Sequence, residues 1–177
     1  MIRIHAGAFK GINIKRVKLE STKETASMVR EAVFNMLYSI SGNCLDLFAG
    51  SGSLGITALS LGASSVTFVD SNKKAIKTIN DNLLKIKSSQ KVSNQDYLSF
   101  LKTNYEKFDL ILLDPPYDFN NYEELLNIVS NHTSDHARIV LEIAKNTKYP
   151  IKFNNFILDR DKVYGSKRVI IYHNLLD

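Results

Sequence analysis

The chain has 177 residues, of which 44% are hydrophobic and 23% are charged. This size and balance suit one globular domain with a substantial core and leave no room for a second full domain. No apolar run reaches the roughly 18 residues that a membrane span needs, and the N-terminal residues do not look like a secretion signal. We therefore expect a cytoplasmic protein without membrane contact.

The positive charge is concentrated near the N-terminus. The formal net charge is +5, and residues 1–30 hold seven basic and two acidic side chains, whereas the rest of the chain balances. A basic segment joined to a neutral body is typical of nucleic-acid contact, although a lysine-rich solvated surface gives the same pattern. The candidate phosphate contacts are Arg3, Lys10, Lys23, Arg30, Lys167 and Arg168.

The first part of the chain predicts a small extension. Within residues 1–20, two stretches alternate apolar and polar side chains, and Gly7 and Gly11 lie between them. This pattern predicts a twisted β-hairpin or two short strands, ahead of a main domain over residues 21–177. Apolar residues at helical spacing then predict a helix over residues 25–40.

The middle of the chain alternates strand and helix patterns. Strands are predicted over residues 44–48, 65–70, near 92, 108–113 and 137–142, with helices ending near 61 and covering about 72–86, 97–101 and 122–130. Two further strand patterns, 156–158 and 169–172, are separated by charged residues and a glycine, which indicates an antiparallel hairpin. The prediction is a Rossmann-like α/β fold, doubly wound around a mostly parallel seven-stranded sheet with this hairpin at its C-terminal edge.

A glycine-rich turn follows the first predicted strand of the sheet. Gly50, Gly52 and Gly55 have the spacing GxGxxG, and Asp70 ends the next predicted strand. Glycines there allow a tight turn and close approach of a ligand, and the acidic residue can accept hydrogen bonds from a ribose diol. Dehydrogenases and methyltransferases share this pattern, and a turn without a ligand is the simpler alternative.

Two other carboxylates narrow the choice of ligand. Asp46, inside the first strand, would repel a dinucleotide pyrophosphate but can anchor the ammonium of an amino-acid group. This favours S-adenosylmethionine over NAD, and capping of nearby backbone N–H groups is the alternative for Asp46. Asp96 and Tyr97 follow the third strand, where an adenine could lie, although Asp96 could equally cap the next helix.

The stretch Asp114-Pro115-Pro116-Tyr117 closes the apolar strand 108–113. The prolines cannot extend that strand, because proline lacks the N–H that a sheet requires. The chain must therefore leave the sheet at its carboxyl edge, where ligands bind in open α/β sheets. The carboxylate of Asp114 and the carbonyl of Pro115 can hold the two hydrogens of an amine, and Tyr117 can stack on an unstacked base.

Taken together, residues 46–52, 70, 96 and 114–117 resemble the ordered motifs of class I S-adenosylmethionine-dependent amino-methyltransferases. The flanks resemble, over nearly the full chain, the RsmD family of small-subunit rRNA guanine-N2-methyltransferases; they include Arg3-Ile4, Thr25, Val29-Arg30-Glu31, Phe34-Asn35 and Lys162-Val163-Tyr164-Gly165. The chain departs from that family at Lys23-Glu24-Thr25 and Ser27, where the family usually has an Arg-Pro-Thr run and an aspartate.

The resemblance implies an enzyme with S-adenosylmethionine as cofactor that acts on ribosomal RNA, and we expect this RNA to be within the small ribosomal subunit or an assembly intermediate. We expect the protein to be a monomer. It implies catalytic roles for Asp114, Pro115, Pro116 and Tyr117. It implies cofactor contacts by Asp46, Phe48, Ala49, Gly50, Ser51, Gly52, Asp70, Ser71, Asp96, Tyr97 and Asp114.

Other functions remain as alternatives. A DNA adenine or cytosine amino-methyltransferase would use the same tetrapeptide, but such enzymes generally need an added region to read base edges, and this chain has no spare segment. A catalytically silent RNA-binding module on the same fold is a second alternative, and a dehydrogenase is a distant third. The histidines and the single cysteine show no metal-ligand spacing, so we expect no metal, and no serine has a histidine partner suited to hydrolysis.

Overall fold

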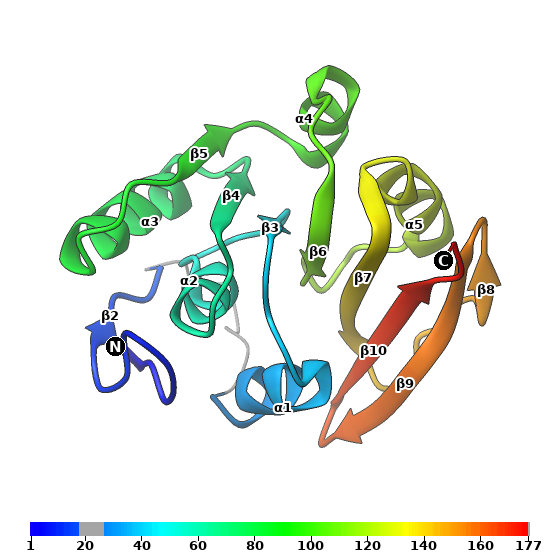
Figure 1. Cartoon of the computed structure of the whole chain (residues 1–177), viewed down its shortest axis with the longest axis horizontal. Coiled ribbons are helices and arrows are strands. Elements are labelled where there is room, and N and C mark those ends of the chain that lie inside the picture. Colours follow the sequence, from blue (N-terminus) through cyan, green and yellow to red (C-terminus); the bar gives the residue numbers. More distant parts are fainter. Residues whose placement is uncertain (18–26, 177) are drawn as a thin grey trace.

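The computed structural model describes residues 1–17 and 27–176 of the chain. Within these residues the centre is an eight-stranded sheet with the order β5-β4-β3-β6-β7-β10-β9-β8, which Figure 1 shows as a fan. Its strands are β3 (Asn43–Asp46), β4 (Ser65–Asp70), β5 (Lys91–Asn94), β6 (Phe108–Leu113), β7 (Thr133–Ala144), β8 (Lys152–Phe153), β9 (Phe156–Tyr164) and β10 (Lys167–Asn174). The helices are α1 (Ser27–Leu37), α2 (Ser53–Ser60), α3 (Lys73–Lys85), α4 (Tyr97–Thr103) and α5 (Tyr122–Ser130).

The sheet is parallel from β5 to β7 and antiparallel beyond it. β10 pairs antiparallel with both β7 and β9. The predicted α/β fold, with a mostly parallel sheet and an antiparallel C-terminal hairpin, is confirmed. The predicted number of seven main strands is wrong, because β8 adds a two-residue strand beside the start of β9. Two residues are too few to show an alternating pattern, so the sequence did not indicate this strand.

The sheet is covered by helices on both faces. Cys44 and Leu45 are neighbours on β3 and point to opposite faces, and they belong to two different buried apolar clusters. Residues of α1, α2 and α3 pack in the cluster of Cys44, whereas residues of α4 and α5 pack in that of Leu45. The core therefore consists of two apolar layers, one on each side of the sheet.

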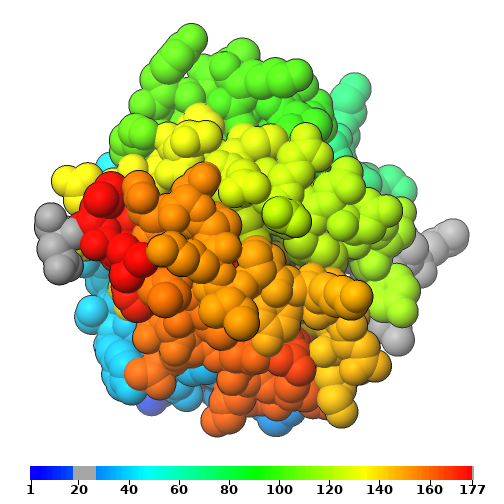
Figure 2. Space-filling model, turned by 90° about the vertical axis from the view of Figure 1, so that its right-hand side faces the viewer, coloured from blue at the N-terminus to red at the C-terminus, as the bar shows by residue number. Residues whose placement is uncertain are grey.

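The C-terminal strands form one side of the molecule together with α5. Figure 2 shows this side as a space-filling model, in which orange residues of the C-terminal part lie against the yellow-green residues of α5. The side chain of Asn154, in the turn between β8 and β9, donates a hydrogen bond to Ser130 Oγ at the end of α5 (2.7 Å). The turn thereby joins the edge of the sheet to α5.

The N-terminal residues form a separate two-stranded antiparallel sheet of β1 (Ile2–Arg3) and β2 (Asn13–Ile14). This extension docks on the end of α2, where Ala8 N–H donates to the carbonyl of Ser60 (2.8 Å). Gly7 adopts a φ of 79°, and a Cβ there would lie 1.8 Å from Ser60 O, so only glycine allows this approach. The predicted boundary near residue 20 and the start of the predicted helix at residue 25 lie outside the described residues.

Candidate active site

The candidate site lies where the winding of the sheet reverses. β3 has parallel neighbours on both sides, β4 and β6. The helices that follow β3 and β6, α2 and α5, pack on opposite faces of the sheet. Such a reversal opens a crevice beyond the carboxyl ends of the strands, where ligands bind. Asp46 ends β3 and Asp114 directly follows β6, so both carboxylates lie at this crevice.

The turn between β3 and α2 exposes bare backbone. Gly50 and Gly52 have φ values of 54° and 78°, where residues with a Cβ are strained. Nothing lies within 4 Å of the position that a Cβ would take at Gly50, so its backbone faces open space. At Gly55, in contrast, a Cβ would come within 2.4 Å of Phe68 Cε1, so this glycine lets α2 pack closely on β4. The turn offers room for a ligand at Gly50 and tight packing at Gly55.

Asp46 is a buried carboxylate, 1% exposed, behind this turn. Its Oδ2 accepts the backbone N–H of Gly55 (2.9 Å), so the capping alternative is present. Its Oδ1 is buried and has no hydrogen-bond partner among the described residues. Burial raises the pKa of Asp46 to about 7; the Gly55 bond opposes this rise, and the charges of Asp114 and Asp70 add to it. An unpartnered buried carboxylate oxygen at this place fits the cationic group of a ligand.

Asp70 ends β4 and supports the glycine turn. Its Oδ2 accepts the backbone N–H of Gly50, and its Oδ1 accepts that of Asn72, both at 2.8 Å. The carbonyl of Ser71, the next residue, accepts the side-chain amide of Asn94 (3.0 Å). The structure thus brings the Asp70 carboxylate beside the open side of the turn.

Asp96 caps α4, the alternative that the sequence left open. Its carboxylate accepts hydrogen bonds from Ser99 Oγ (2.6 Å) and from the Ser99 backbone N–H (3.0 Å). These two bonds, in that order of importance, lower the pKa of Asp96. A carboxylate held in this way is fixed in direction at the first turn of α4.

An aromatic cluster lies beside Asp96. The ring of Tyr97 lies 5.3 Å from that of Phe48 and 5.6 Å from that of Phe119, and Phe119 also contacts Tyr122 at 5.1 Å. The sequence predicted Phe48 and Tyr97 as cofactor contacts but missed Phe119 and Tyr122. Phe119 stands two residues after Tyr117, and this closeness to the tetrapeptide was the available signal. The cluster supplies an apolar wall that an aromatic ligand can contact.

The tetrapeptide forms the rim of the crevice. Asp114 is partly buried, Pro115 is buried, and Pro116 is exposed. The carbonyl of Pro116 accepts the backbone N–H of Phe119 (2.9 Å), which closes a turn. The side chain of Tyr117 is 93% exposed at the tip of this turn. An aromatic ring that packs on nothing in the described protein is available to stack on a base.

Lys167, at the start of β10, faces the carboxylate of Asp114. Its Nζ lies 3.7 Å from Asp114 Oδ1 and 3.0 Å from Glu142 Oε1. The sequence predicted Lys167 as a phosphate contact and did not indicate Glu142. Glu142 lies within an apolar run of β7, between Leu141 and Ile143, so its type alone was a signal, because a buried carboxylate needs a partner.

The other residues predicted to contact RNA differ in their exposure and in their partners. Arg3 and Lys10 are exposed on the N-terminal extension. Arg168 donates to both carboxylate oxygens of Asp161, at 2.9 and 2.7 Å. Lys23 lies outside the described residues.

The position of Arg30 differs from the predicted contact with an RNA phosphate. Its side chain is 2% exposed, and its guanidinium donates to the carbonyl of Arg3 (2.9 Å) and to Ser27 Oγ (3.4 Å). A phosphate contact requires an accessible guanidinium, so this placement contradicts the predicted RNA contact. The physical reason is that the guanidinium satisfies a backbone carbonyl of β1 and so joins α1 to the extension.

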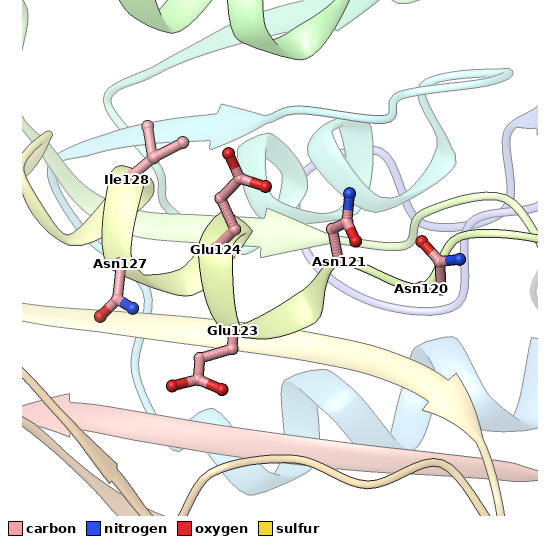
Figure 3. A pocket seen from close by; sticks show the side chains of 6 residues that line it. All are labelled: Asn120, Asn121, Glu123, Glu124, Asn127 and Ile128. Atoms are coloured by element: carbon pink, nitrogen blue, oxygen red, sulfur yellow. The ribbon is translucent and has the colours of Figure 1, made fainter.

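An open groove lies around the start of α5, beside the site. Figure 3 shows that its lining is polar except for one residue: Asn120, Asn121, Glu123, Glu124, Asn127 and Ile128. It contains none of the predicted site residues. Glu124 connects this groove to the candidate site. The pKa of Tyr97 is raised mainly by burial and in second place by the charge of Glu124.

No group of three or more histidine, cysteine, aspartate or glutamate side chains is arranged to hold a metal ion in residues 1–17 and 27–176. In the same part of the chain, none of the helices has the length and apolar character required to cross a membrane.

Comparison with known proteins places the chain in a family. The family described as conserved hypothetical protein 95 matches residues 2–173. Ribosomal RNA small subunit methyltransferase D of Haemophilus influenzae is 36% identical over 98% of this chain and 94% of its own length. The protein of the same name from Escherichia coli is 30% identical over 97% of this chain and 89% of its own length.

A solved structure gives the same result. A methyltransferase-like protein of Escherichia coli is 29% identical and superimposes with a TM-score of 0.88 over 99% of both chains. The sequence comparison and the structural comparison therefore agree. The chain belongs to the conserved hypothetical protein 95 family, which is the RsmD methyltransferase family that its motifs resemble.

Proposed function

We propose that this protein transfers a methyl group from S-adenosylmethionine to the exocyclic N2 amine of a guanosine in small-subunit ribosomal RNA. The names of the relatives from Haemophilus influenzae and Escherichia coli support the reaction class and the RNA. The guanosine amine rests on the resemblance of the tetrapeptide and its flanks. We further propose that the protein acts in the cytoplasm, as a monomer.

The cofactor fits the residues at the crevice. The unpartnered Oδ1 of Asp46 suits its ammonium group, and the Asp70 carboxylate beside Gly50 suits its ribose hydroxyls. Asp96 and Tyr97 are assigned to the adenine. The remaining assigned contacts follow the turn and strand ends, namely Phe48, Ala49, Gly50, Ser51, Gly52, Ser71 and Asp114. When bound, S-adenosylmethionine supplies a methyl group that its sulfonium has already activated.

The protein must then hold the N2 amine of the guanosine in line with this methyl group. The Asp114 carboxylate and the Pro115 carbonyl hold the two amine hydrogens, which directs the nitrogen lone pair toward the methyl carbon. As the nitrogen–carbon bond forms, the sulfur–carbon bond breaks and its electron pair stays on sulfur. The nitrogen becomes positive and loses one proton, which Asp114 can accept and pass to solvent.

The base must leave its stack to reach the crevice. Tyr117, 93% exposed at the rim, is assigned to stack on the extruded guanine. Stacking of a base on an aromatic side chain contributes about 1–3 kcal/mol. The exposed Arg3 and Lys10 of the extension, with Arg168 and Lys23, are assigned to the RNA phosphates.

One observation carries the proposal: Asp46 ends β3 and Asp114 directly follows the adjacent strand β6. The carboxylate assigned to the cofactor ammonium and the carboxylate assigned to the amine therefore lie at the same edge of the sheet. The test offers methyl-labelled S-adenosylmethionine with small ribosomal subunits, naked ribosomal RNA and duplex DNA, followed by digestion to nucleosides. Label in 2-methylguanosine is expected. Label in DNA alone would overturn the proposal in favour of a DNA amino-methyltransferase, and absence of label in all three would favour a silent RNA-binding module.

A further inference from the structure

Lys167 is placed against the carboxylate that is assigned to the amine. Its ammonium bridges Asp114 Oδ1 at 3.7 Å and Glu142 Oε1 at 3.0 Å. The Glu142 side chain is 2% exposed, that of Asp114 is 21% exposed and that of Lys167 is 32% exposed. The lysine therefore reaches from the rim toward two acidic groups rather than out into solvent.

Strand register produces this arrangement. β6 and β7 pair in parallel up to Leu113 and Leu141, so the next residues, Asp114 and Glu142, lie side by side where β6 ends. β7 and β10 pair antiparallel with Glu142 opposite Val169, and Lys167 is on the same face one pleat away. Diagonal neighbours of this kind lie within reach of a long side chain. The contact is thus fixed by backbone pairing.

Among the described residues, titratable groups from four elements interact with Asp114 or with its partner Lys167. Asp46 of β3 and Glu142 of β7 are acidic, Lys167 of β10 is basic, and the hydroxyl of Tyr122 on α5 interacts with both Asp114 and Lys167. Burial lowers the pKa of Lys167, but the charges of Asp114, Glu142 and Tyr122 together raise it above its ordinary value. Lys167 therefore stays protonated at neutral pH. Like charges disfavour the ionised form of a carboxylate, and a neighbouring ammonium favours it.

We propose that Lys167 is a positioning residue for methyl transfer, which keeps the Asp114 carboxylate ionised and fixes its direction toward the amine. This inference rests on the proposed function of Asp114. Oδ1 faces the ammonium, and the other oxygen, Oδ2, is assigned to the amine hydrogen. Glu142 holds the same ammonium, at 3.0 Å. A protonated Asp114 would offer a weaker acceptor and could not take the proton released after transfer.

The role differs from the phosphate contact that the sequence suggests. A phosphate contact would act on the affinity for RNA, and its loss would reduce the salt dependence of binding. A positioning role acts on the turnover number and on its pH dependence. The two roles therefore predict different measurements for the same substitution.

The test compares Lys167→Met, which removes the charge but keeps much of the volume, with Lys167→Arg, which keeps the charge. Lys162→Met is the matched control, because Lys162 lies on the adjacent strand with its ammonium 5.5 Å from the Tyr164 ring centre. For Lys167→Met we expect kcat at pH 7 to fall about tenfold. We also expect the acidic limb of the curve of kcat against pH to move to higher pH by roughly one unit. Lys167→Arg should restore most of the wild-type profile, and Lys162→Met should keep all of it.

A second readout does not depend on catalysis. In cofactor-free protein labelled with ¹³C at aspartate carboxyls, the Asp114 signal should titrate at higher pH in Lys167→Met than in wild type. An unchanged Asp114 titration would overturn the inference, as would a raised KM for RNA with an unchanged kcat profile. Failure of the wild type to methylate ribosomal RNA would instead overturn the proposed function, and it would leave the carboxyl titration interpretable.

Discussion

The side-chain amide of Asn82 donates a hydrogen bond to the carbonyl oxygen of Ser51, at 2.9 Å. The same amide group donates to the carbonyl of Lys15 (3.0 Å), and its oxygen accepts the backbone N–H of Lys15 (2.7 Å). Asn82 is fully buried. One side chain of α3 therefore ties the basic N-terminal extension to the glycine turn.

Replacing Asn82 by alanine should destabilise the fold. The change removes three hydrogen bonds and leaves the buried carbonyl of Ser51 and the partly buried backbone groups of Lys15 without these partners, which costs about 2–4 kcal/mol. Urea unfolding measures the loss. Asn80→Ala, at an exposed position of the same helix, is the control and should change the free energy of unfolding by less than about 1 kcal/mol. Equal effects of the two substitutions would contradict this role of Asn82.

Gly50→Ala and Gly55→Ala should separate cofactor binding from stability. A Cβ at Gly50 enters open space, so the stability loss is limited to left-handed backbone strain of about 1–2 kcal/mol, whereas the cofactor would meet the added methyl. At Gly55 the Cβ would clash with Phe68, and overpacking costs about 1–3 kcal/mol or more. Calorimetry should show that Gly50→Ala loses more affinity for S-adenosylmethionine than Gly55→Ala does, when each loss is compared with the loss of folding stability of the same variant. A larger affinity loss for Gly55→Ala would reverse the assignment.

Asp46 should make the stability of the cofactor-free protein depend on pH. Its pKa rises from 3.8 to about 7 on folding, so between these values the folded state binds more protons than the unfolded state. The contribution of this group to stability therefore falls as pH rises from about 4 to about 7. Asp46→Asn removes the titration, and the variant should gain stability relative to wild type as pH rises through this window, by up to about 4 kcal/mol. Urea unfolding at pH 4.5 and 7.5 measures the difference, and an equal difference at both values would refute the prediction.

Asp114→Ala should abolish most of the methyl transfer and leave cofactor binding largely intact, because the other assigned cofactor contacts remain. Loss of one preorganised group at a reacting centre typically lowers kcat by about 10²- to 10³-fold. Single-turnover transfer to ribosomal RNA measures the chemistry, and calorimetry with S-adenosylmethionine measures binding. If cofactor binding were lost as well, the assignment of Asp114 to the amine would be wrong.

Tyr117→Ala should weaken RNA binding or turnover without a change in stability. The ring is 93% exposed, so its removal should alter the free energy of unfolding by less than about 0.5 kcal/mol. Loss of stacking should cost about 1–3 kcal/mol, which corresponds to a 5- to 150-fold drop in kcat/KM for the RNA. Tyr105→Ala is the matched control, because that tyrosine is 91% exposed in the loop after α4. Equal kinetic effects at both positions would argue against a stacking role.

Local patterns in the sequence predicted most of the fold. The apolar run of β6 and the helical spacing of α5 each predicted the observed bounds, and the polar cap at Asp96 marked the start of α4. These features depend on neighbouring residues, because side-chain periodicity and capping act within one or two turns or pleats. The motif order from Asp46 to Tyr117 likewise predicted a candidate site beyond the carboxyl ends of the strands.

The sequence by itself determined the α/β class, the strand ends that carry the site and the family motifs, because each depends on residues close together in the chain. The tertiary structure alone decided that Lys167 faces Asp114 and Glu142, that Arg30 is buried under the extension, and that Asn82 joins the extension to the turn. These contacts join residues far apart in sequence, and only strand order and register bring such residues together.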